Sequence, residues 1–249
     1  MTTPGAVAFI QARVGSTRLP GKVLEPIEGR PMLAWVVERV AAAPDVREVV
    51  LLVPEGARDE PLRRLAAQLG FRCVSGPEED VLDRFRKAAR QLAADPILRI
   101  TADCPLADAE VIGQVIDHYG STGADYASVA TGALPKEAGL RRYPDGLDAE
   151  VVGAAVLETA WREATDPFER EHVLAFVWRR PERFRLAWLE AEEDMGDERW
   201  TVDHEADLAF VRAVYARLAP LGPFGYREVR ALLEREPELR SLNSALRVG

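Results

Sequence analysis

The sequence contains few cysteines and few histidines, and these shortages narrow the classes of protein that it can encode. Among 249 residues there are two cysteines, Cys73 and Cys104, without CxxC spacing, so we expect reduced thiols rather than a disulfide framework. The three histidines, His118, His172 and His204, have no spacing typical of a zinc site. They also indicate no Ser-His-Asp arrangement.

The sequence also lacks long apolar runs and an excess of positive charge. No uninterrupted apolar stretch approaches the roughly 20 residues that span a bilayer, and no basic segment of a signal peptide precedes the first apolar run. We therefore expect a cytoplasmic protein without a membrane partner. The net charge of −9 argues against nucleic acid as a partner, although a local group of cations can still bind a small phosphate ligand.

What the sequence does contain is an ordinary globular composition, with 47% hydrophobic and 29% charged residues, which can fill one large core. Continuous apolar runs of strand length occur at residues 6–10 and 49–53, and residues 71–74 and 97–100 are predicted as further short strands. Between them, apolar residues recur at helical spacing near 32–40, 58–69, 81–92 and 111–119. This alternation predicts an α/β fold with a doubly wound, mostly parallel sheet.

The alternation becomes less regular after residue 120. Residues 120–150 contain glycine, proline and charge without a clear period, which is typical of long functional loops. Helical patterns return near 153–164, 168–179 and 204–218, and residues 184–189 alternate like a strand. We therefore expect a single domain over residues 1–249. Within it, residues 120–190 or so form an inserted lid that binds the acceptor or makes a subunit interface.

The loop from Arg13 to Lys22 follows the first predicted strand, and in an open α/β sheet that position lies where ligands bind. Its glycines allow close approach of the backbone, its hydroxyls can donate, and its arginines and lysine can bind phosphate oxygens. It is not a P-loop, because five residues separate Gly15 from Gly21 and Val23 replaces the hydroxyl that binds magnesium. The Rossmann pattern G-x-G-x-x-G does not occur either. A polar, solvated loop is the alternative that composition leaves open.

Two aspartates follow short apolar runs and are candidate metal ligands. Asp103 follows the strand predicted at residues 97–100, and Asp203 lies just before the helix predicted at 204–218. Mg²⁺ prefers oxygen ligands and commonly joins a protein carboxylate to a substrate phosphate. From the sequence alone, an N-cap or turn role is slightly favoured for Asp103, and an N-cap is the alternative for Asp203.

Six motifs in order resemble the cytidylyltransferases that activate acidic sugars, such as the enzymes that make CMP-sialic acid and CMP-3-deoxy-manno-octulosonate. The first is the loop, Gln11-Ala-Arg-Val-Gly-Ser-Thr-Arg-Leu-Pro-Gly-Lys22. The longer match, to the branch of spore-coat polysaccharide biosynthesis protein F, adds Ser75–Arg84, Arg99–Leu106, Tyr143–Glu150, Arg170–His172 and Trp200–Leu208. The resemblance spans residues 6 to about 215 and implies a Rossmann-like nucleotide-diphospho-sugar transferase fold.

The resemblance also implies roles for individual residues. Lys22 and Arg13 would be catalytic, Asp103 and Asp203 would bind Mg²⁺, and the remaining positions would contact the two substrates. The nucleotide contacts would be Ala12, Gly15, Ser16, Thr17, Arg18, Gly76, Asp80 and Arg84, and the sugar contacts Tyr143, Asp145, Asp148, Glu150, Arg170 and His172. For Asp80 a helix cap is the alternative, and for Arg170 an ion pair with Glu171 or Asp166.

The implied reaction is the Mg²⁺-dependent transfer of CMP from CTP to an acidic sugar, with release of pyrophosphate, in surface or spore-coat polysaccharide biosynthesis. The implied partners are CTP and a sugar acceptor, and the implied assembly is a homodimer. Two alternatives stay open at this point. One is a sugar-1-phosphate nucleotidyltransferase that uses another nucleotide, and the other is a nucleotide-binding regulatory subunit without catalysis.

Overall fold

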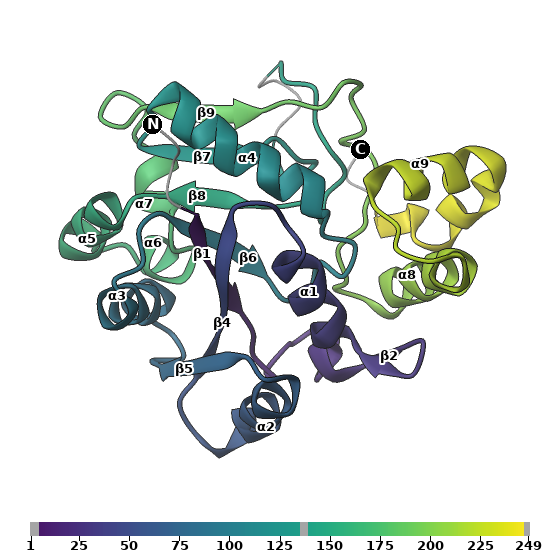
Figure 1. Ribbon diagram of the computed structural model, residues 1–249, viewed down its shortest axis with the longest axis horizontal. Helices are drawn as coiled ribbons and strands as arrows, with labels where there is room; N and C mark the ends of the chain where they lie inside the picture. Colours follow the sequence, from purple (N-terminus) through teal and green to yellow (C-terminus); the bar gives the residue numbers. More distant parts are fainter. Residues whose placement is uncertain (1–4, 135–138, 247–249) are drawn as a thin grey trace.

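A seven-stranded sheet forms the centre of the computed structural model, which describes residues 5–134 and 139–246. Its strand order is β5-β4-β1-β6-β8-β7-β9 (Figure 1). The bounds are β1 Ala6–Gln11, β4 Val46–Pro54, β5 Arg72–Gly76, β6 Ile97–Thr101, β7 Tyr126–Val129, β8 Glu150–Val152 and β9 Leu186–Leu189. All pairings are parallel except those of β8 with β6 and β7, which confirms the doubly wound, mostly parallel sheet.

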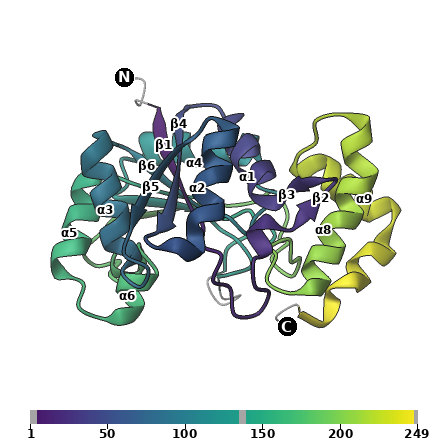
Figure 2. The same ribbon diagram turned by 90° about the horizontal axis from the view of Figure 1, so that it is seen from below.

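Helices cover both faces of the sheet, as the alternation of strands and helices predicts. One group comprises α1 Met32–Ala41, α2 Glu60–Leu69, α4 Ala109–Thr122, α8 Glu205–Leu218 and α9 Tyr226–Arg235. The other comprises α3 Val81–Leu92, α5 Ala154–Glu163, α6 Pro167–Glu171 and α7 Ala175–Trp178. Figure 2 shows α3 and α5 on one side of the molecule and α8 and α9 far on the other.

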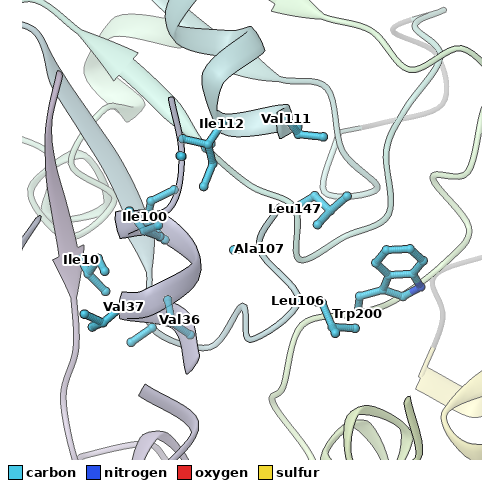
Figure 3. Close-up of a cluster of buried hydrophobic side chains, with 14 of the residues drawn as sticks. Ile10, Val36, Val37, Ile100, Leu106, Ala107, Val111, Ile112, Leu147 and Trp200 are labelled. Carbon is cyan, nitrogen blue, oxygen red and sulfur yellow. The ribbon is translucent and has the colours of Figure 1, made fainter. Parts of the chain in front are cut away.

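Two clusters of buried side chains hold these layers together, because successive residues of a buried strand point to opposite faces. From β1, Ile10 packs with the helices of the first group and Phe9 with those of the second. Figure 3 shows Ile10 and Ile100 beside Val36 and Val37 of α1. On the opposite face the rings of Phe9 and Phe85 meet edge to face, with centroids 5.7 Å apart.

The segment 120–190, expected as an inserted acceptor-binding or interface segment, contributes β7, β8 and β9 to the same sheet. Periodicity did not reveal β7 or β8, since four and three residues are too few to establish a period. The helix expected at 168–179 is wrong as one element. It is divided into α6 and α7, because Val173 has a φ of 29° and interrupts the helical geometry.

The carboxyl ends of β1 and β6 lie side by side, since Gln11 pairs with Thr101 in the ladder. The loop after β1, which leads into the short 3-10 helix η1 Lys22–Leu24, and the segment after β6 therefore meet at one edge of the sheet. No helix within the described ranges combines the length and the apolar content needed to cross a membrane.

Candidate active site

The loop that follows β1 is closed by its own backbone and anchored by a buried carboxylate. The carbonyl of Val14 accepts hydrogen bonds from the amides of Ser16 (2.9 Å) and Gly21 (3.0 Å). Asp59, at the end of the 3-10 helix η2 Ala57–Asp59, is buried and accepts the amide of Val14 at 2.8 Å. These bonds hold the loop in one conformation at the edge of the sheet.

Two of the glycines predicted to contact the nucleotide allow an arginine to approach the backbone closely. A Cβ at position 15 would lie 3.0 Å from Nη1 and 3.1 Å from Cζ of Arg58. A Cβ at position 76 would lie 2.8 Å from Cγ of Arg84, a distance that real Cβ contacts do not show. Gly15 and Gly76 therefore make room for these two side chains, and any contact with a nucleotide stays a prediction.

Lys22 lies between the two aspartates that the sequence proposed as metal ligands. Its Nζ donates to Oδ2 of Asp103 at 2.7 Å, to Oδ1 of Asp203 at 2.9 Å and to the carbonyl of Val202 at 2.7 Å. Burial lowers the pKa of Lys22, but the two carboxylates outweigh burial and raise the pKa above its ordinary value. The structure therefore brings together three residues that are separated by up to 181 positions in the sequence.

Asp203 is held by several cations, and this defines its charge state. Arg18 approaches it at 2.6 Å and Arg199 at 2.8 Å, in addition to Lys22. Burial raises the pKa of Asp203, yet the hydrogen bonds from these three side chains hold that pKa well below its ordinary value. Asp203 is therefore ionised at neutral pH.

Two residues, Arg199 and Asp207, hold Asp203 in place from the protein interior. Nε of Arg199 donates to Oδ1 of Asp207 at 3.2 Å. The fully buried Asp207 also accepts the amides of Asp203 and His204 at 3.0 Å each. Because Asp207 satisfies the backbone at the start of α8, it fixes the position from which Asp203 projects.

The pocket beside Lys22 has a volume of about 460 Å³ and is lined mainly by polar side chains. Ten predicted residues line it: Ala12, Arg13, Ser16, Thr17, Arg18, Lys22, Arg84, Asp103, His172 and Asp203. These residues come from the loop after β1, the start of α3, the segment after β6, the residue that follows α6 and the segment before α8. A small phosphate-bearing ligand fits its size and its excess of cations.

Arg84 is the most deeply buried cation of this pocket, with 3% exposure. Its Nη2 donates to the carbonyl of Glu78 at 3.2 Å, while its buried Nε has no partner among the described residues. Burial, followed by the charge of Arg13, lowers the pKa of Arg84. A buried donor without a partner is unfavourable.

Asp80 and Arg170 do not line the pocket, because they bind each other. Nε of Arg170 donates to Oδ2 of Asp80 at 3.1 Å, and Nη1 donates to the carbonyl of Trp161 at 2.8 Å. Asp80 also caps α3 by accepting the amide of Asp83 at 2.9 Å. The ion pair expected as an alternative for Arg170 does form, but with Asp80 rather than Glu171 or Asp166.

The four predicted sugar contacts in Tyr143–Glu150 also lie outside this pocket. Tyr143 packs edge to face on Tyr226, Asp145 pairs with Arg199 at 2.8 Å, and Asp148 accepts the hydroxyl of Thr131 at 2.7 Å. Glu150 pairs with Arg99 and accepts the hydroxyl of Tyr126. Burial raises the pKa of Asp145 to about 7, with a further contribution from the charge of Asp148. The sugar-binding roles of these residues stay predictions.

Four polar residues line the pocket although they were not predicted, namely Gln11, Arg99, Thr101 and Glu171. All lie inside the motifs that carried the resemblance. The alternation of a strand would have identified two of them, since Arg99 and Thr101 share a face with Asp103 two residues further on. Glu171 lies 4.0 Å from Arg13 and is half exposed, so this ion pair is weak.

Asp103 and Asp203 are the residues of the pocket best suited to hold a divalent cation. The described part of the chain contains no group of three or more histidine, cysteine or acidic side chains arranged for a metal. Two carboxylates nevertheless fit Mg²⁺, because this ion is commonly held by one or two carboxylates together with water and substrate phosphates. The donor set therefore fits a magnesium ion that arrives with a phosphate ligand.

A second hollow of about 1060 Å³ lies between α1, α4 and α9 and shares no lining residue with the pocket at Lys22. Tyr143 is the single predicted site residue that lines it. Although this hollow has the larger volume of the two, it is not lined by Lys22, Asp103 or Asp203.

Comparison with known proteins gives a family match over most of the chain. A family model described as cytidylyltransferase matches residues 7–229. The spore coat polysaccharide biosynthesis protein SpsF of Bacillus subtilis is 32% identical over 237 residues, which cover 92% of this chain and 94% of that protein. The 3-deoxy-manno-octulosonate cytidylyltransferase of Yersinia enterocolitica is 32% identical over 173 residues, or 66% of this chain and 65% of that protein.

Solved structures agree with this match. A cytidylyltransferase from Leptospira borgpetersenii superimposes with a TM-score of 0.84 at 26% identity, covering 94% of this chain and 95% of that chain. A CMP:2-keto-3-deoxy-manno-octonic acid synthetase in complex with CTP superimposes with a TM-score of 0.65 at 20% identity, covering 86% and 99%. At that identity the second likeness shows the fold alone.

Proposed function

The chain belongs to the cytidylyltransferase family, and we propose that it transfers CMP from CTP to a hydroxyl of an acidic sugar, with release of pyrophosphate. The observation that carries the proposal is the convergence of Lys22, Asp103 and Asp203 at one end of the polar pocket. A regulatory subunit without catalysis would not need these groups to meet. The similarity to SpsF supports a role in surface or spore-coat polysaccharide biosynthesis.

In the proposed reaction, a sugar oxygen attacks the α-phosphorus of CTP in line and pyrophosphate leaves. Negative charge increases on the leaving phosphates, so fixed positive groups beside them stabilise the transition state. Arg13, Arg18 and Lys22 line the pocket on the anchored loop and supply such charges. The chain needs no nucleophile of its own, since the sugar oxygen is the attacking atom.

We propose that Mg²⁺ binds at Asp103 and Asp203 when the nucleotide is present. The ion would neutralise phosphate charge and help to orient the phosphate oxygens. The low pKa of Asp203 supports this assignment, because that carboxylate is charged over the whole physiological range. Lys22 balances the two carboxylates in the protein alone, which keeps them together before the ion arrives.

We propose that the base and ribose lie against the start of α3. Arg84 supports this part of the proposal, because it lies at the start of α3, lines the pocket and supplies a buried positive charge there. Asp80 and Gly76 would act indirectly, by capping α3 and by making room for Arg84.

We also propose that the protein works in the cytoplasm, where CTP is made, and that it forms a homodimer. The two cysteines are free thiols, which suits a reducing compartment. For the dimer, the exposed rings of Phe168 (43%) and Trp178 (36%) lie within the segment expected to form the interface. Sedimentation of the purified protein would test this assembly.

The reaction is tested by incubating the protein with each nucleoside triphosphate in turn, Mg²⁺, and a panel of acidic sugars and sugar phosphates. Pyrophosphate release should require CTP and an acidic sugar together. Release with UTP and a sugar 1-phosphate only would instead indicate a sugar-1-phosphate nucleotidyltransferase.

A further inference from the structure

Two residues without an assigned role, Gln11 and Arg99, contact each other and line the pocket. Gln11 ends β1, and Arg99 is in the neighbouring strand β6. Gln11 is the ladder partner of Thr101. Asp103 follows Thr101 by two residues, which corresponds to about 7 Å along an extended chain. The pair is therefore adjacent to the proposed catalytic centre.

The contact between the two side chains fixes what Gln11 can offer a ligand. Nε of Arg99 donates to Oε1 of Gln11 at 3.0 Å. An arginine has donors only, so the amide oxygen must face it and the amide Nε2 must point elsewhere. Nε2 has no partner among the described residues, and Gln11 lines the pocket. Gln11 therefore presents hydrogen-bond donors to whatever occupies the pocket.

Arg99 is held rigidly and also keeps one nitrogen free. Its Nη1 pairs with Glu150 of β8, and Glu150 in turn accepts the hydroxyl of Tyr126 at 2.7 Å. Nη2 has no partner within the residues that the structure describes, and the side chain is 15% exposed and lines the pocket. A guanidinium fixed in this way loses little conformational entropy when it binds a ligand.

Together, Nε2 of Gln11 and Nη2 of Arg99 are hydrogen-bond donors without an adjacent free acceptor in the described part of the chain, since the amide oxygen of Gln11 is bound to Arg99. A planar carboxylate is well matched to such a pair, because each of its oxygens can accept from one of the two nitrogens. The arginine that the sequence suggested for this role, Arg170, has its Nε, Nη1 and Nη2 bound to Asp80 and Trp161 and lies outside the pocket.

Building on the proposed function, we infer that Nε2 of Gln11 and Nη2 of Arg99 bind the carboxylate of the acceptor sugar. In a 2-keto sugar acid the carboxylate and the anomeric hydroxyl are attached to the same carbon. A carboxylate held beside Thr101 therefore places the hydroxyl next to Asp103 and the phosphate-binding loop. The two residues select for acidic sugars and position the oxygen that attacks.

The test compares Gln11→Glu and Gln11→Met with Gln68→Glu, an exposed glutamine of α2 that serves as the matched control. Glutamate at position 11 can still accept from Arg99, so the fold is preserved, but it repels a carboxylate. Steady-state kinetics with CTP would use 3-deoxy-manno-octulosonate, N-acetylneuraminate and the methyl ester of each. Calorimetry would measure CTP binding to each variant in the absence of a sugar.

We expect Gln11→Glu to raise KM for the free acids about ten- to a hundredfold, and Gln11→Met somewhat less, while KM for CTP changes about twofold or less. The methyl esters should be poor acceptors for the wild type, and Gln11→Glu should affect them far less than the acids. Arg99→Lys keeps a positive charge for Glu150 and should likewise weaken the acids alone.

Three results overturn the inference. Equal effects on acid and ester would show that the two residues do not bind the carboxylate. A loss confined to CTP binding would show that they contact the nucleotide instead. Wild-type kinetics in Gln11→Glu, as in Gln68→Glu, would refute the subsite while the proposed function stands. A wild type that releases pyrophosphate with no acidic sugar would overturn the proposed function and the subsite together.

Discussion

Replacing Lys22 by methionine removes the one ammonium group that joins the two aspartates of the pocket. The side chain of Lys22 is 9% exposed, and its Nζ makes three hydrogen bonds shorter than 3 Å. Breaking a buried ion pair generally destabilises a protein by about 3–5 kcal/mol. Here the carboxylates of Asp103 and Asp203 are 27% and 17% exposed, and Arg18 and Arg199 still bind Asp203, so we expect a smaller loss of about 1–3 kcal/mol.

This loss corresponds to a decrease in Tm of about 3–10 °C for a protein of this size. Because methionine also removes a fixed positive charge from the phosphate site, kcat should fall by about a hundred- to a thousandfold. In Lys22→Met the two carboxylates repel each other without their shared counter-charge. Mg²⁺ should therefore raise the Tm of the variant more than the Tm of the wild type, even without nucleotide.

The assays are thermal unfolding with and without Mg²⁺ and pyrophosphate release with CTP and an acidic sugar. Lys87→Met is the control, since Lys87 is 52% exposed and pairs only with Asp83 on the surface of α3 among the described residues. A Lys22→Met variant with nearly wild-type kcat would contradict the role of Lys22 at the phosphates, and one that Mg²⁺ stabilises no more than Lys87→Met would contradict its role between the two carboxylates.

The other predictions concern the support behind the site, the metal and pH. Asp207→Asn should lower the unfolding free energy by about 2–4 kcal/mol in urea titrations, since the buried carboxylate of Asp207 binds Arg199 and two backbone amides; a change below about 0.5 kcal/mol would contradict this. Arg170→Ala should reduce Tm by a few degrees without changing KM for the sugar, because Arg170 is bound to Asp80; a selective rise in that KM would restore its predicted sugar contact. Chelation by EDTA should abolish pyrophosphate release and added Mg²⁺ should restore it, whereas activity that survives chelation would argue against a metal at Asp103 and Asp203. The pKa of Asp145 is raised by burial from 3.8 to about 7, so between about pH 4 and pH 7 the native state holds a proton that the unfolded state has lost. The contribution of Asp145 to stability should therefore be lost as the pH rises through this interval, and the stability of Asp145→Asn relative to wild type should rise between about pH 4 and about pH 7 in urea titrations; a difference independent of pH would contradict the assignment.

The arrangement of the sheet was predictable because its buried strands are continuous apolar runs. Residues 6–10 of β1 and 49–53 of β4 are such runs, and α1 between them shows a clear apolar face. β7 and β8 were missed because each is too short to define a period, and β8 also carries the charged Glu150. The interruption at Val173 could not be predicted either, since nothing in a valine indicates a positive φ.

The centre of the site was predictable in identity but not in geometry. Lys22, Asp103 and Asp203 were each identified from a motif, and the fold brings them into hydrogen-bond contact. A sequence gives no information about which partner a long side chain will find. For that reason Arg170, expected at the sugar, is bound to Asp80 instead.

The residues overlooked in the pocket show the same limit. Gln11 and Arg99 are ordinary polar residues of two buried strands, and only the register between β1 and β6 places them together. Tyr143 illustrates the reverse case, because its motif suggested the sugar while its ring lies against Tyr226 in a separate hollow.

The most direct test of the proposed reaction is the mass of the product formed from CTP, Mg²⁺ and an acidic sugar. We expect a product that contains CMP joined through its phosphate to the intact sugar, with one pyrophosphate released for each product molecule. A nucleoside diphosphate sugar, formed only when a sugar 1-phosphate replaces the acid, would contradict it.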